Sequence, residues 1–226
     1  MRPDPRRATK SSAGFEMGNI LFHLQFPTPP EWNSLVFESF FESLDGWYNQ
    51  IWNSAVVTLS QNHVLLHTAA QASSKALIMK TPYYPIGTVT WTKPRTLKTK
   101  LRAKNYTNAG ELLRAFTGGY DTPIGFGFTF DGNKLYGRTA NGSLANLVQL
   151  EVIPAGAYDV TRNLRAEFTP GSRVDFYVDE VLKGTSTTRL PTGDDGALIF
   201  AHIECTSIDA FQRDLYVTQF KLTQEI

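Results

Sequence analysis

The sequence predicts an all-β protein, either a sandwich or a barrel, and two observations carry this prediction. From Leu35 onward, apolar side chains recur mostly at every second position, which is the period of a strand with one buried face. Turn-forming residues such as Gly, Asn, Asp and Pro separate about a dozen short segments of this kind. Many short strands at regular spacing are typical of sandwiches and barrels.

The expected strands follow one another along most of the chain. They cover residues 56–59, 64–68, 76–80, 97–104, 112–117, 124–130, 135–139, 147–152, 164–168, 174–178, 197–204 and 215–222. Asp131-Gly132-Asn133 and Asn141-Gly142 predict tight hairpins. A single helical turn is expected near 207–212. The last strand has apolar residues in both alternating sets near its start, so we expect both of its faces to be covered there.

Composition excludes several classes of function. Twenty-two basic and 21 acidic residues leave a net charge of +1, which argues against a general nucleic-acid-binding protein. The single cysteine, Cys205, rules out an internal disulfide and makes cysteine-ligated zinc or iron–sulfur sites untenable. No run of about 18 apolar residues is present, so we expect no membrane partner.

Residues 1–34 differ from the remainder of the chain. They are rich in proline and lack strand periodicity, and their basic residues include Arg2, Arg6, Arg7 and Lys10. We therefore expect an extended assembly arm over 1–34, followed by one domain over 35–226. The arm either packs along its own domain or lies on neighbouring subunits. No apolar core of a signal peptide follows the arginines, and none is expected.

Two stretches resemble the concanavalin A-like lectin/glucanase superfamily of LamG-like jelly rolls. FESFFESLDGWYNQIW over 37–52 resembles the acidic segment before the first sandwich strands, and LRAEFTPGSRVDFYVDEVLKGTSTTRLPTG over 164–193 resembles a paired-strand passage of that superfamily. The resemblance implies a jelly-roll β-sandwich of two antiparallel sheets, with the last strand near the first. Glu180 replaces the usual glycine of the hairpin, and a type I turn would tolerate it.

The resemblance covers both enzymes and binding proteins, so catalysis has to be argued from the residues. Glucanases of this fold carry an E-x-D-x-E or E-x-D-x-x-E strand, and the sequence contains neither. Asp175 and Asp179 share a strand face but stand about 13 Å apart, too far for the close carboxylate pair of a retaining hydrolase. We therefore expect no enzyme.

We also expect no cofactor. Some lectins of this fold bind calcium with loop carboxylates. Asp194 and Asp195, between two glycines, would be the place for such an ion here, although ordinary turn residues explain them better.

Glycan binding requires exposed aromatic rings that stack on sugars, flanked by polar side chains. Trp47 and Trp52, with Tyr136, Arg138 and Tyr177 on predicted strands, are the candidate glycan-binding residues. The simpler alternative is that each ring fills the core.

A basic run also requires an explanation. Lys98, Lys100, Arg102 and Lys104 project from one face of a predicted strand, with no acidic residue between them. An acidic glycan or nucleic acid could dock there. The alternatives are an edge strand protected by lysines or contact with an acidic patch of a neighbouring subunit.

Together these features predict a non-enzymatic structural or decoration subunit of a virus or phage particle. Its partners would be other subunits of the particle or of a homo-oligomer, and it would be located in the virion. The alternative is a carbohydrate-binding module or lectin that binds glycans in an extracellular or cell-surface setting. A glycoside hydrolase or polysaccharide lyase is less favoured.

Overall fold

The computed structural model describes residues 16–17, 20–21, 34–44, 46–80, 90–104, 112–118, 124–142, 144–154, 159–192, 201–207 and 209–225. The chain divides into two compact units, Met1–Asn33 and Ser34–Ile226. In the first unit, β1 (Glu16–Met17) pairs with β2 (Ile20–Leu21). The basic residues expected to form an assembly arm lie outside the described residues, so the arm remains a prediction.

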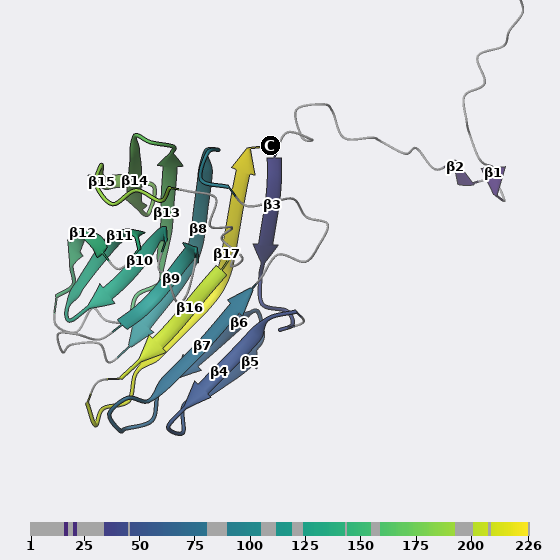
Figure 1. The fold of residues 1–226 in the computed structure, drawn as a ribbon. Helices are drawn as coiled ribbons and strands as arrows, with labels where there is room; N and C mark the ends of the chain where they lie inside the picture. The colour runs from purple at the N-terminus through teal and green to yellow at the C-terminus, as the bar shows by residue number, and fades with distance from the viewer. Residues whose placement is uncertain are drawn as a thin grey trace, which may run out of the picture. The chain divides into compact units, whose positions relative to one another are not determined.

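The second unit is a β-sandwich of two antiparallel sheets, as predicted (Figure 1). The smaller sheet has the order β12 (Leu144–Val152), β11 (Lys134–Asn141), β10 (Gly125–Asp131), β9 (Leu112–Gly118), β16 (Ala201–Thr206), β7 (Lys75–Lys80) and β4 (Tyr48–Trp52). The larger sheet has the order β15 (Val181–Ser186), β14 (Arg173–Val178), β13 (Arg162–Thr169), β8 (Arg95–Lys104), β17 (Asp214–Glu225), β6 (His63–His67) and β5 (Val56–Ser60). In addition, β3 (Ser34–Ser39) pairs with β17, so the last strand does lie beside an early one.

Aromatic side chains fill much of the space between the sheets. Phe126 of β10 stacks on Phe168 of β13, with ring centroids 5.5 Å apart, and Phe128 meets the edge of Phe176 at 5.7 Å. Gly137 lies against the same ring, and a Cβ atom there would stand 2.4 Å from Phe176. Glycine is therefore required at this position for the two sheets to approach each other.

The helical turn expected near 207–212 is absent from the described residues of that segment, which form bends. The Ser207 hydroxyl donates to the carbonyl oxygen of Phe211 at 2.8 Å, and Asp209 Oδ1 accepts from the Phe211 amide at 3.0 Å. These side chains satisfy backbone groups that a helix would otherwise pair. No helix in the described ranges has the length and apolar character needed to cross a membrane.

The hairpin between β14 and β15 does not contain the expected type I turn. Asp179 and Glu180 both have positive φ, at 49° and 64°, which is the signature of the primed turns that suit the twist of a hairpin. Asp179 Oδ1 accepts hydrogen bonds from the amide and the side chain of Asn163, both at 3.0 Å. Glu180 forms an ion pair with Arg165 at 3.0 Å. These contacts help to offset the cost of left-handed backbone at two non-glycine residues.

A β-bulge interrupts β17, which lies between β8 on one side and β6 and β3 on the other (Figure 1). Val217 pairs with Leu101 and Gln219 pairs with Lys100, so Thr218 is an extra residue in the strand. The hydroxyl of Thr218 donates to the Lys100 carbonyl oxygen at 3.2 Å.

The bulge reverses the alternation of side chains along β17. Leu215 and Val217 before it are fully buried, and so are Phe220 and Leu222 after it. Gln219 is therefore brought to the outer face of the sheet, next to Lys221. The expectation that both faces of this strand are covered near its start is wrong, because Tyr216 and Thr218 on the outer face are only half-buried. The shift of one residue places Leu215, Val217, Phe220 and Leu222 on the core face.

Deletion of Thr218 should therefore be tolerated, although it lies in a central strand. Removal of the extra residue leaves regular alternation and an unchanged register with β8, at the cost of about 1–2 kcal/mol for the lost hydrogen bond and altered twist. Deletion of Lys98 is the control, because it turns half of the core residues of β8 outward. Thermal unfolding should show a cooperative transition for the first variant and none for the second. Loss of folding in both variants would contradict this account of the bulge.

Candidate functional site

The structure places the predicted glycan-binding residues on opposite sides of the sandwich. Tyr136 and Arg138 alternate with buried Leu135 and Thr139, so they face outward from the smaller sheet. Tyr177 faces outward from β14 of the larger sheet. These residues therefore cannot form one binding site.

Neither of the two candidate tryptophans lies beside Tyr136 and Arg138. Trp47 packs against Phe37 and Phe41, with ring centroids 5.9 and 5.2 Å away, so it is a half-buried part of the core margin. Trp52 remains 38% exposed on β4, with the Lys75 ammonium 5.1 Å from its ring. Five strand spacings, about 24 Å, separate β4 from β11 in the smaller sheet.

The basic run lies on the outer face of the larger sheet. Lys98, Lys100, Arg102 and Lys104 face outward from β8, while the intervening residues are buried, as predicted. The proposed role in edge protection is wrong, because β8 lies inside the sheet, between β13 and β17. Arg95 of the same strand faces the interior instead, where its guanidinium stacks on Trp91 at 3.9 Å and burial lowers its pKa to about 9.

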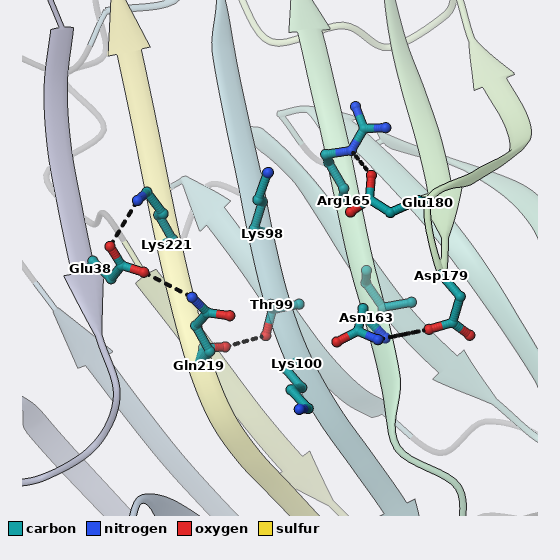
Figure 2. A pocket seen from close by; sticks show the side chains of 11 residues that line it. Glu38, Lys98, Thr99, Lys100, Asn163, Arg165, Asp179, Glu180, Gln219 and Lys221 are labelled. Atoms are coloured by element: carbon teal, nitrogen blue, oxygen red, sulfur yellow. Dashed lines mark hydrogen bonds and ion pairs between the residues drawn. The ribbon is translucent and has the colours of Figure 1, made fainter. Parts of the chain in front are cut away.

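A hollow of about 440 Å³ lies over the middle of this face (Figure 2). Its lining comes from β3, β17, β8 and β13 and from the turn after β14. We call it the lysine hollow, after Lys98, Lys100 and Lys221. Its volume lies within the range of pockets that hold small ligands.

Fixed polar contacts surround the lysine hollow on both sides. On one side, the Glu38 carboxylate accepts from Lys221 Nζ and from Gln219 Nε2, each at 2.8 Å. On the other side, Asp179 holds the amide side chain of Asn163 at 3.0 Å. Figure 2 shows these pairs flanking Lys98 and Lys100. The walls of the hollow are thus held in place without a ligand.

A second hollow, also of about 440 Å³, continues from the first and shares Lys100 and Gln219 with it. Its lining includes the amide side chains of Gln61 and Asn62 and the ring of Phe40, which is 51% exposed. The two hollows together form a polar groove over several strands of the larger sheet, and Phe40 is the aromatic residue in the lining of its second part.

The residues considered for catalysis and metal binding have structural roles where they are described. Asp175 accepts hydrogen bonds from Thr185 at 2.6 Å and from Arg173 at 2.7 Å, and Asp179 stabilises the turn. No group of three or more metal-ligating side chains is present among the described residues. The loop with Asp194 and Asp195 lies outside them.

No protein-family model matches the chain, and no curated protein matches its sequence. Among solved structures, the binding domain of botulinum neurotoxin DC in complex with rat synaptotagmin II is similar, with a TM-score of 0.58 and 10% identity over 80% of this chain and 44% of that one. A second similar structure comes from work on botulinum neurotoxin type C, a toxin whose cell entry depends on interaction with two ganglioside molecules. Its TM-score is 0.55, with 8% identity over 80% of this chain and 44% of that one. A protein of unknown function from Shewanella oneidensis MR-1 has a TM-score of 0.60 and 11% identity over 91% of this chain and 97% of that one.

These likenesses show a shared fold and no more, because identity is 11% or lower in all three. The chain spans less than half of the neurotoxin chains that it matches.

The Lys221 hydrogen bond lowers the pKa of the Glu38 carboxyl below its usual range, and the charge of Lys98 adds to this effect. A lowered pKa in the folded state means that this contact stabilises the fold above the unfolded-state pKa and is lost as pH falls through the folded-state value. Because Glu38 is largely exposed, we expect its contribution to the free energy of unfolding to be under about 1 kcal/mol.

NMR titration of Glu38 should show the lowered pKa and its rise in Lys221→Met. The control Lys134→Met, on the smaller sheet, should leave it unchanged, and an unaltered pKa in Lys221→Met would contradict the assignment.

Proposed function

We propose that this chain is a non-enzymatic carbohydrate-binding protein with a concanavalin-like jelly-roll sandwich, and that it binds a saccharide along the groove of the larger sheet. The observation that carries the proposal is the groove itself: two adjoining hollows share Lys100 and Gln219, and the exposed Phe40 lines the second of them.

The chemistry of the groove suits sugar hydroxyls. Amide side chains both donate and accept hydrogen bonds, as hydroxyl groups do, and Asn163, Gln219, Gln61 and Asn62 supply them along the groove. Asn163 and Gln219 are already held by Asp179 and Glu38, so less side-chain freedom is lost on binding. The ring of Phe40 offers an apolar face for a pyranose.

The fold likeness is consistent with this proposal. One similar neurotoxin binding domain is in complex with SialylT, with a TM-score of 0.55 and 9% identity, over 80% of this chain and 44% of that one. The predicted role as a virion subunit in a particle or homo-oligomer rests on the basic arm expected over 1–34, together with the expected lack of a signal peptide and of a catalytic carboxylate strand. The basic residues of the arm lie outside the described residues, so this role remains a prediction.

A glycan array probed with the full chain, followed by calorimetry on the best saccharide, tests the proposal. Asn163→Ala and Gln219→Ala should each weaken binding about tenfold, which corresponds to about 1.4 kcal/mol for a lost set of hydrogen bonds. Tyr136→Ala, on the outer face of the smaller sheet, is the matched control and should bind as the wild type does. No binding to any saccharide, or loss of binding only in Tyr136→Ala, would refute this site.

A further inference from the structure

Three cations stand side by side across the larger sheet. Lys98 on β8 lies directly opposite Lys221 of β17 on one side and opposite Arg165 of β13 on the other. Side chains in such cross-strand positions lie within about 5 Å of each other at their Cβ atoms, and like charges placed there repel. The fold therefore carries an unfavourable row of positive charge in its central strands.

Acidic side chains form ion pairs only with the two ends of this row, and Glu38 reaches Lys98 only through its longer-range charge. Lys221 pairs with Glu38 at 2.8 Å, and Arg165 pairs with Glu180 at 3.0 Å. Lys98 has no ion pair within 4.0 Å among the described residues, and neither has Lys100, which stands two positions further along β8. Both of these lysines line the lysine hollow, and Figure 2 shows them between the paired groups.

We propose that the ligand of the lysine hollow is an acidic saccharide whose carboxylate or sulfate group lies between the ammonium groups of Lys98 and Lys100. This inference rests on the proposed function and names the class of saccharide. The two lysines share one strand face at a spacing of about 6.6 Å, so a single anionic group can contact both flexible side chains. Gln219 and Asn163 stand opposite Lys100 on either side, where they can contact the hydroxyls of the same sugar.

The surroundings favour a saccharide with isolated charges over a nucleic acid. Acidic residues close both ends of the row, Glu38 at one and Glu180 at the other, and would repel a continuous polyanion. Two rings on this face are already covered: Arg165 lies 3.6 Å from the ring centre of Tyr177, and Arg102 lies 4.1 Å from that of Tyr216. Among the aromatic residues named for the groove, Phe40 alone keeps an open ring, whereas single-stranded nucleic acids stack successive bases on several rings.

The test compares a neutral oligosaccharide with its uronic-acid and sulfated counterparts, using the full chain and calorimetry at low and high salt. The acidic forms should bind at least about tenfold more tightly than the neutral one, and salt should remove most of this difference. The double variant Lys98→Gln/Lys100→Gln should lose the preference, so that its affinities for the acidic and the neutral forms become about equal. The charge-matched control Lys134→Gln, on β11 of the smaller sheet, should keep the preference.

Equal affinity for neutral and acidic saccharides would overturn this inference and leave the proposed function intact. Absence of binding to every saccharide would instead remove the proposed function itself. Binding of single-stranded DNA as tight as that of the acidic saccharides, and equally sensitive to the two lysine substitutions, would overturn the assignment to saccharides.

The ligand-free protein provides a second readout. Because Lys98 stands between two cations, Lys98→Gln should raise the melting temperature at low salt, and high salt should reduce the difference. A uronic-acid oligosaccharide should raise the melting temperature of the wild type more than that of Lys98→Gln. A lower melting temperature for Lys98→Gln without ligand would show that Lys98 has a structural role and would overturn the inference.

Discussion

The larger sheet depends on one constraint: the apolar side chains in both halves of β17 must face the core, and in this sequence the bulge at Thr218 meets that constraint. This strand pairs with β8 along most of its length, and with β6 and β3 along its two halves. Without the bulge at Thr218, the same residues could not place Leu215 and Phe220 on one core face. The core of the sandwich and the polar surface above it are thus set by one local irregularity.

The bulge also connects the fold to the candidate site. It directs Gln219 outward, where Glu38 accepts its hydrogen bond, and it keeps Lys221 in the same row as Lys98. Bulges often redirect a side chain near a functional site. Here the redirected amide of Gln219 lines both hollows, so the bulge places a residue of a central strand in the candidate site.

The sequence predicted the layers of this protein better than its candidate site. Period-two alternation identified β8 correctly, down to the outward lysines, because that strand is regular. It failed at β17, although apolar residues at 215, 217, 220 and 222 carry the signature of a bulge. The site residues Glu38, Asn163 and Gln219 come from strands far apart in the chain, and only strand order and register bring them together. Local periodicity does not encode those long-range pairings. For the same reason the sequence made Tyr136 and Tyr177 candidates for the same kind of site, although they lie on the outer faces of different sheets.

The central claim is that the outer face of the larger sheet, and not that of the smaller sheet, binds an acidic saccharide. A crystal structure of the full chain with a uronic-acid disaccharide tests it most directly. The account predicts the ligand in the lysine hollow, with its carboxylate within hydrogen-bonding distance of Lys98 and Lys100. A disaccharide seated beside Tyr136 and Arg138, with the lysine hollow occupied only by water, would contradict it.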